Sequence, residues 1–394
     1  MKILGLIVEY NPFHNGHLYH LQTSKRLTNP DVTIAVMSGH FTQRGEPACT
    51  AKWHRAQAAI INGVDLVVEL PYAYANQSAN LFAIGAVSLL QALATTHLVF
   101  GSESGCLKTL TKLAQQMDDD KFQIAVKAAI QTGLSMPKAY AQINPALTGA
   151  NNTLGIQYLR AISNLGAQIT PLTIKRHLSN YHDAQPIHDK IASATAIRNL
   201  LNQQLDYSTY VPQLIDDQYM PLQNWESHYK FLRHKLLTTA PTELVKIHDM
   251  VEGIEHRLIK SAMSSSSFAT FLATVATKRY PNTRIQRLCA NVLTGTLKQA
   301  IASWDLQAGA PYVRILGFNE NGSAYLKAIK RKVAVPIYST FSKTSHPMLA
   351  HELRVSAAYA SVYEASYATA KIIKQEYMGL PFKQHTTTAK KPRI

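Results

Sequence analysis

Two histidines near the start of the chain have the type and spacing needed for chemistry on a phosphate group. His14 and His17 lie in the run Glu9-Tyr10-Asn11-Pro12-Phe13-His14-Asn15-Gly16-His17, where an apolar segment gives way to a predicted helix. A glycine-containing loop that opens a helix binds phosphate through its free N–H groups. Two imidazoles at this spacing can both stabilise charge on such a ligand. A histidine pair alone is weak evidence, but its position directly after the first predicted strand indicates a phosphate site.

A hydroxyl-containing run in the middle of the chain also opens a predicted helix. It reads Ser193-Ala194-Thr195-Ala196-Ile197-Arg198. Ser193 is a good N-cap, and this structural role would explain it without any ligand. Alternatively, Ser193, Thr195 and Arg198 bind the outer phosphates of a nucleotide. The pairing with the two histidines favours the second interpretation.

Polar or flexible residues follow two further predicted strands. Arg176, within Lys175-Arg176-His177, could stack on a base or bind phosphate, and Gly101 would let a base or ribose approach the backbone closely. Asn152, which opens a helix, is either an N-cap or a ligand contact. Ordinary loop chemistry remains the alternative at each of these positions.

The segment 38–55 offers further candidates. Four polar residues of the loop 38–47 form either the acceptor side of the pocket or a solvated turn: His40, Gln43, Arg44 and Glu46. Three residues of the following helix are candidates for contacts with RNA or with the pocket: Lys52, Trp53 and Arg55.

Strands and helices alternate in the first half of the chain. Apolar patterns predict strands at 2–8, 32–38, 64–70, 97–100 and 168–174. Helices are predicted at 17–27, 51–62 and 78–94. This alternation implies an α/β fold with a doubly wound parallel sheet. Because ligands bind such sheets at the carboxyl ends of the strands, the loops 9–17, 38–47 and 101–105 should converge on one crevice.

The length of 394 residues favours two domains. We expect a catalytic domain at 1–205, with a helical insertion at about 118–165 that opens with Asp118-Asp119-Asp120. Those aspartates are expected to start a helix, and a metal cluster is the less favoured alternative. From 206 to 385 the pattern is mainly helical, with helices at 226–260, 266–279 and 284–302 and a strand–helix–strand unit at 312–338. The polar tail 386–394 is expected to be disordered.

The basic charge is concentrated in the second half of the chain. Residues 1–219 hold 16 Lys and Arg against 14 Asp and Glu, whereas residues 220–394 hold 24 against 10. A nearly neutral half joined to a strongly basic one suggests that the second half binds a polyanion such as nucleic acid. Solubility charge is the alternative. The exposed-looking run Lys330-Arg331-Lys332 is a candidate for RNA backbone contact.

Composition excludes several classes of protein. No apolar stretch reaches the roughly 18–20 residues that span a bilayer, and the N-terminus does not have the pattern of a signal peptide. Three distant cysteines form neither a disulfide framework nor a paired metal motif, so we expect the reducing cytoplasm. Spacing indicates no metal site and no Walker A motif, and Mg²⁺ is expected only as the partner of a triphosphate.

The two phosphate motifs together resemble those of the HIGH nucleotidyltransferase superfamily, which implies a Rossmann-like core. Several longer segments are similar to the bacterial tRNA(Met) cytidine acetate ligase family. They are Gly5–His17, Met37–Ala48, Asp65–Pro71 and Phe100–Glu103, with supporting likeness at Thr283–Leu288 and Arg314–Asn319. The resemblance therefore covers most of the chain. One departure is Ser193-Ala194-Thr195, since related enzymes carry two serines and a threonine there.

The resemblance implies a two-step reaction. Acetate attacks the α-phosphate of ATP to give acetyl-adenylate, and the exocyclic amine of the wobble cytidine in elongator tRNA(Met) then takes the acetyl group. It also implies that His14 and His17 are catalytic. The ATP-binding residues it implies are Ile7, Val8, Glu9, Tyr10, Asn11, Pro12, Phe13, His14, Asn15, Gly16, His17, Leu18, Tyr19, His20, Gly101, Asn152 and Arg176, to which Ser193, Thr195 and Arg198 are added from their motif.

Two other functions stay open at this point. An adenylyltransferase acting on a small phosphate ester would share the nucleotide site, but it would not need the basic second half. A non-enzymatic RNA-binding protein with a relic nucleotide fold would not need the intact His14-Asn15-Gly16-His17.

Overall fold

The computed structural model of the chain describes residues 1–134, 136–144, 149–176, 189–212, 222–251, 253–341, 346–363 and 366–384. His177 and the tail 386–394, for which the sequence analysis makes predictions, lie outside these residues.

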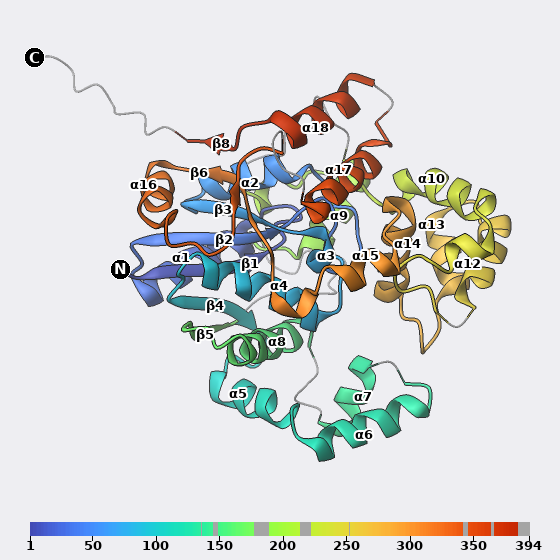
Figure 1. The fold of residues 1–394 in the computed structure, drawn as a ribbon, viewed down its shortest axis with the longest axis horizontal. Helices are drawn as coiled ribbons and strands as arrows, with labels where there is room; N and C mark the ends of the chain where they lie inside the picture. Colours follow the sequence, from blue (N-terminus) through green and yellow to red (C-terminus); the bar gives the residue numbers. More distant parts are fainter. Residues whose placement is uncertain are drawn as a thin grey trace, which may run out of the picture.

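A mixed sheet of eight strands forms the centre of the molecule (Figure 1). Its first five strands are parallel and lie in the order β5-β4-β1-β2-β3. Their bounds are β1 (Ile3–Val8), β2 (Val32–Ser38), β3 (Leu66–Leu70), β4 (His97–Ser102) and β5 (Thr170–Lys175). The predicted α/β fold with parallel strands is therefore confirmed for this part of the sheet. β1 lies between β4 and β2, so the turn that follows it opens at the middle of the carboxyl edge.

Both faces of the sheet are covered, because successive side chains of a strand point to opposite sides. Leu4 and Leu6 of β1 pack in one buried cluster with α1 (Asn15–Thr28) and α2 (Lys52–Ile61). Ile3 packs in a second cluster with α4 (Ala79–Ala92) and α8 (Ala150–Asn164). Strands buried on both faces are apolar along their whole length, which is why the sequence shows them as continuous apolar runs.

Helices fill the insertion expected at about 118–165, and one further helix, α5 (Leu107–Gln116), precedes it. α5, α6 (Asp120–Gln131) and α7 (Met136–Ile143) lie beyond the β5 edge of the sheet in Figure 1. The Asp119 side chain caps α6 by accepting the N–H of Lys121 at 2.8 Å, so the aspartate run does start a helix. α8 belongs to the same segment of the chain but covers the sheet.

The middle of the second half is helical, but its helices are shorter than predicted. The expected helix 226–260 is divided into α10 (Trp225–Thr238), α11 (Pro241–Leu244) and α12 (Ile254–Ser264), since Pro241 and Gly253 interrupt it. The expected helix 284–302 is divided at Gly295, whose φ is 64°, into α14 (Asn282–Thr294) and α15 (Lys298–Ser303). α13 (Phe268–Val275) lies between α12 and α14, and in the first half of the chain the short helix α3 (Tyr72–Ala75) precedes α4.

The last part of the chain returns to the sheet, which the sequence analysis does not predict. β6 (Val313–Phe318) pairs antiparallel with β3, and β7 (Ile337–Tyr338) and β8 (Phe382–Lys383) both pair with β6. The predicted strand–helix–strand unit is present, with α16 (Glu320–Ile329) between its strands, but it extends the first sheet. The predicted parallel sheet thus gains an antiparallel neighbour at β6. None of the helices in the described parts of the chain combines the length and apolar character that crossing a membrane requires.

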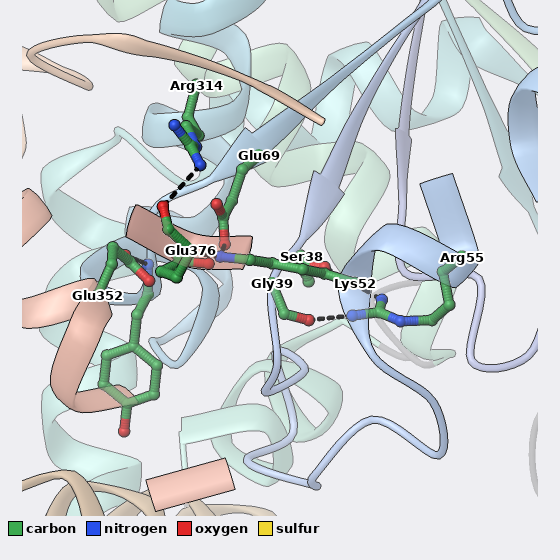
Figure 2. Close-up of polar contacts among 9 residues, drawn as sticks. Ser38, Gly39, Lys52, Arg55, Glu69, Arg314, Glu352 and Glu376 are labelled. Carbon is green, nitrogen blue, oxygen red and sulfur yellow. Dashed lines mark hydrogen bonds and ion pairs between the residues drawn. The ribbon is translucent and has the colours of Figure 1, made fainter. Parts of the chain in front are cut away.

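A buried group of charges joins the final helices, α17 (Pro347–Ala360) and α18 (Ser366–Met378), to this sheet (Figure 2). Lys52 Nζ lies 2.6 Å from Glu69 Oε1 of β3 and 2.7 Å from Glu376 Oε1 of α18, and none of the three side chains is more than 2% exposed. Burial opposes the charge on Lys52, but Glu376 and Glu69 outweigh it and raise the pKa of Lys52. Burial, with Glu69 nearby, raises the pKa of Glu352 well above its usual range.

These contacts correct one expectation. Lys52, Trp53 and Arg55 are 0%, 5% and 2% exposed, so they cannot bind RNA at the surface. The partners of Lys52 lie on β3 and α18, and those of Arg55 lie at the end of β2 and in loops, so the helix sequence alone gives no sign of them.

We predict that Lys52→Met lowers the free energy of unfolding by about 3–5 kcal/mol, because it leaves two buried carboxylates without their cation. Lys246→Met is the matched control. Both side chains of its ion pair with Glu243 are exposed, so this pair should contribute less than about 1 kcal/mol to the free energy of unfolding. Urea unfolding of the two variants and the parent chain measures the difference. Equal, small losses in both variants would show that the buried ion pairs do not hold α18 to the sheet.

Candidate active site

The two histidines lie at the start of α1, directly after β1. His14 is the N-cap, and its Nδ1 accepts the N–H of Gly16 at 3.0 Å. Its ring lies against that of His17, with the ring centres 3.7 Å apart. A Cβ at Gly16 would come within 2.8 Å of the His14 ring, so a larger residue there would displace this ring. The helix begins at Asn15, two residues before the predicted start.

The histidines are uncharged in this structure. Burial, together with the charges of Arg176 and Arg198, lowers the pKa of His14 to about 3. Burial lowers the pKa of His17 well below its usual range, with His14 and Arg176 adding to the effect. Because His14 Nδ1 accepts a hydrogen bond, the neutral ring carries its proton on Nε2. His14 can therefore donate a hydrogen bond to an anion.

The hydroxyl run lies against the histidine turn, as the sequence analysis expects. Arg198 of α9 (Ala194–Asn202) donates to the backbone oxygen of Asn11 at 2.9 Å. The Asn15 side chain donates to the backbone oxygens of Lys190 and Thr209 at 2.8 and 2.9 Å. Two segments almost 180 residues apart in the sequence thus share one side of the sheet edge.

The residues of this run have different local roles. Ser193 caps α9, since its Oγ accepts the N–H of Ala196 at 3.0 Å, and it is 4% exposed. The N-cap interpretation of Ser193 is therefore confirmed. Thr195 Oγ1 accepts from Arg198 Nη2 at 3.3 Å, and the same nitrogen forms an ion pair with Glu46 at 3.1 Å. Arg198 thus joins the run to both the histidine turn and the loop after β2.

A second group of residues lies on the other side of β1, at the ends of β4 and β5. The backbone N–H of Arg176 donates to the Ser102 oxygen at 2.9 Å, and a Cβ at Gly101 would contact the Arg176 side chain. The side-chain oxygen of Asn152 accepts the N–H groups of Glu103 and Ser104 at 3.1 and 3.2 Å. Asn152 therefore shapes the loop after β4. Gly101 lies within β4, which runs two residues further than predicted.

The loop 38–47 is packed into the protein and is not a solvated turn. Its Gln43 N–H donates to the Glu9 carboxylate at 2.7 Å, and burial raises the pKa of Glu9. His40 is 1% exposed and stacks on Tyr359, with ring centres 4.3 Å apart. Of the loop's polar side chains, Glu46 is the one that contacts Arg198.

Other residues predicted for the site either pack against the histidine rings or lie away from them. The rings of Tyr10 and Phe13 pack edge-on or tilted against His17, at 5.0 and 5.9 Å. Tyr19 is 41% exposed on α1. The basic run Lys330-Arg331-Lys332 is exposed at the end of α16 and makes no contact with the histidine turn among the contacts of the described residues.

The sequence analysis missed the role of Arg55. Its guanidinium donates to the backbone oxygens of Thr50, Glu9, Ser38 and Gly39 (Figure 2 shows the last contact). Glu9 follows β1, and Ser38 ends β2, so this single side chain fixes the two strand ends that flank the site. A lone arginine in an apolar helix carries no sequence signal of such a role.

The pH dependence of stability should report the buried histidines. Burial and Arg176 lower the pKa of His20 from 6.5 to about 4, so the unfolded chain binds a proton that the folded protein does not. Stability is then lost as the pH falls from about 6.5 toward 4. We predict that His20→Gln reduces the dependence of the unfolding free energy on pH, between pH 6 and 5, by up to about 1.4 kcal/mol per pH unit.

Urea unfolding at several pH values measures this slope. His256→Gln serves as the control, because His256 is 71% exposed on α12, and it should leave the slope unchanged. If His20→Gln keeps the parent slope, His20 titrates alike in the folded and unfolded chain.

Comparison with known proteins agrees with this geometry. Residues 1–375 match the HIGH Nucleotidyl Transferase family. The chain is 41% identical to the tRNA(Met) cytidine acetate ligase of Anoxybacillus flavithermus, over 97% of this chain and 100% of that protein. It is 40% identical to the enzyme of the same name from Bacillus subtilis, over 97% of each chain.

Solved structures match over the same length. The apo crystal structure of Thermotoga maritima TmcAL aligns with a TM-score of 0.90 and 32% identity, covering 98% of this chain and 100% of that one. The structure of the same protein bound with alpha-thio ATP aligns with a TM-score of 0.88, 31% identity and the same coverage. The chain therefore belongs to the HIGH nucleotidyl transferase family and, within it, to the tRNA(Met) cytidine acetate ligases.

Proposed function

We propose that this protein is an ATP-dependent ligase that activates acetate as acetyl-adenylate and transfers the acetyl group to the wobble cytidine of elongator tRNA(Met). The observation that carries the proposal is the contact of Arg198 with Asn11, which joins the two phosphate motifs at one place. The names of its relatives supply the acetate and the cytidine. The alpha-thio ATP bound to TmcAL supports ATP as the nucleotide.

In the first step, an oxygen of acetate attacks the α-phosphorus of ATP. The bond from this phosphorus to the bridging oxygen breaks, and pyrophosphate leaves with the electron pair. The protein must hold the reactants in line and stabilise the growing negative charge. We assign charge stabilisation to His14 Nε2–H, His17 and Arg198, and further ATP contacts to Gly101, Asn152 and Arg176.

In the second step, the exocyclic nitrogen of cytidine bonds to the acetyl carbon. The bond between that carbon and the phosphate oxygen breaks, AMP leaves with the electron pair, and the nitrogen releases one proton to water. The base must leave its stack in the RNA loop to reach the acyl group. The strongly basic second half of the chain, including Lys330-Arg331-Lys332, would hold the rest of the tRNA through its phosphates.

The side chains available as metal ligands limit how Mg²⁺ could be held. Among the described residues, no three His, Cys, Asp or Glu side chains form a group able to hold a metal ion. Glu9 and Glu46 are already bonded to Gln43 and Arg198. We therefore assign Mg²⁺ to the phosphate oxygens of ATP, with which it would enter. The unpaired thiols Cys49, Cys106 and Cys289 support a cytoplasmic location.

The direct test incubates the protein with ATP, acetate and tRNA(Met) and analyses the tRNA nucleosides by mass spectrometry. We expect one acetylated cytidine per tRNA, and acetate-dependent exchange of pyrophosphate into ATP without tRNA. Exchange supported by small phosphate esters in place of acetate would instead favour the adenylyltransferase. Binding of tRNA without any ATP turnover would favour the RNA-binding protein.

His14→Asn makes this test specific to the site. Asparagine keeps an oxygen for the N-cap of α1 but removes the Nε2–H donor, so the fold should persist. The exchange rate should fall about a hundredfold, the usual effect of losing one such donor. His256→Asn is the control and should retain the parent rate.

We also predict that Arg176→Ala weakens the binding of ATP about tenfold or more, since a charged hydrogen bond to phosphate typically contributes about 1.5–3 kcal/mol. Binding of tRNA should change little. Titration calorimetry with a non-hydrolysable ATP analogue and with tRNA compares the two affinities, and Lys175→Ala, one residue away, is the control. An equal loss for both ligands would refute the assignment of Arg176 to ATP.

A further inference from the structure

Arg198 lines a cavity of about 270 Å³ between the sheet domain and the helical region. One wall comes from the loop after β2 and from α9, through Glu46, Cys49 and Leu201. The other wall comes from the start of α10 and from α13, through Trp225 and Phe268. A ligand in this cavity would contact both the nucleotide-binding half and the basic half of the chain.

The chemistry of the cavity wall fits a flat heterocycle with a polar edge. The buried rings of Trp225 and Phe268 stack on each other, with their centres 4.5 Å apart and their planes at 9°, and Leu272 adds a further apolar side chain. Four carboxamide side chains complete the lining: Asn202, Gln223, Asn224 and Gln286. The half-buried Gln286 forms no side-chain hydrogen bond within the described ranges, so its amide can read the edge of a base.

A second hollow adjoins this cavity at Glu226, which lines both. Its volume is about 550 Å³, and it is lined by Lys230 and Arg233 together with the hydroxyl groups of Ser264, Ser265 and Ser266. The Glu226 carboxylate is engaged with the start of α13, where it accepts the N–H groups of Phe268 and Ala269 at 2.8 and 2.9 Å. Cations and hydroxyls beside an aromatic pocket are the combination that binds single-stranded nucleic acid.

The sheet order places this cavity opposite the group around Gly101 and Arg176. That group lies at the ends of β4 and β5, on one side of β1, whereas Glu46 follows β2 on the other side. Arg198 lines the cavity, bonds to Asn11 beside the histidine turn and lowers the pKa of His14 by its charge. A ligand in the cavity and a nucleotide on the β4–β5 side would therefore meet at Arg198, whose side chain bonds to the backbone that precedes the histidine turn.

We infer that the cavity between Arg198, Trp225 and Phe268 receives the acceptor pyrimidine base of an RNA loop, with the flanking phosphates on Lys230 and Arg233. The inference rests on the proposed function and adds the place where the second substrate binds.

The test fills the cavity without removing any core side chain. Ala269 lines the cavity but is exposed, so Ala269→Trp should fold. We expect kcat/KM for tRNA acetylation to fall at least tenfold, while acetate-dependent pyrophosphate exchange without tRNA stays within twofold of the parent. Ala273→Trp is the matched control, because Ala273 is exposed one turn further along the same helix and does not line the cavity. It should retain both activities.

Three outcomes separate this inference from the proposed function. Parent-level acetylation by Ala269→Trp overturns the inference and leaves the function intact. An equal fall of acetylation and exchange also overturns it, because the cavity would then hold ATP or acetate. The absence of exchange in the parent protein overturns the proposed function itself.

Lys230→Gln tests the second hollow separately. Lys230 is exposed on α10, and its loss should weaken tRNA binding several-fold and reduce the salt dependence of that binding. Lys260→Gln, on the exposed surface of α12 and outside both hollows, should have a smaller effect. Equal effects of the two variants would show that the RNA phosphates do not bind in this hollow.

A crosslinking measurement does not depend on how the variants fold. Full-length tRNA(Met) carrying 5-bromocytidine at the wobble position is irradiated with the parent protein, and the crosslinked peptides are sequenced. The peptides should include residues 222–226 or 268–272. Crosslinks confined to other segments overturn the inference.

Discussion

The site depends on one buried guanidinium. Arg55 donates hydrogen bonds to four backbone oxygens, and two of these belong to Glu9, after β1, and Ser38, at the end of β2. Carbonyl groups at the ends of buried strands would otherwise lack partners, at a cost of about 1–3 kcal/mol each. By supplying those bonds, Arg55 fixes the histidine turn relative to the loop 38–47. In that arrangement the Gln43 N–H donates to Glu9, and Glu46 forms its ion pair with Arg198.

How the site residues come together was predictable because it follows from sheet geometry. Parallel strands place their following loops at one edge, so the approach of Arg198 to the turn after β1 could be expected from the order of strands and helices. The individual side-chain roles were not predictable. Ser193 and Asn152 were each compatible with a cap or a ligand contact, and only their hydrogen bonds show that Ser193 caps α9 and that Asn152 also supports the loop after β4.

The errors in the fold have a common cause, which is that the deciding partner is distant in the sequence. Nothing within 313–318 indicates that this strand pairs antiparallel with β3, since its apolar pattern would suit any central strand. Lysine is a residue type usually found at the surface. The Glu376 carboxylate that pairs with the buried Lys52 lies 324 residues away, on α18. By contrast, the two long predicted helices are divided at residues that the sequence itself shows, Pro241 and Gly295. The prediction followed the apolar periodicity and did not end the helices there.

Charge also links the histidines to the ligand that they would bind. Burial lowers the pKa of His14 most, and the two arginines that would attract a triphosphate, Arg176 and Arg198, lower it further. An anion placed among these groups offsets the positive charge of both arginines and so raises the pKa of His14 and His17. Phosphate binding therefore increases the basicity of the imidazoles beside it. An imidazole whose pKa rises in this way can take up a proton when the anion binds and then donate a charged hydrogen bond to the phosphate oxygens.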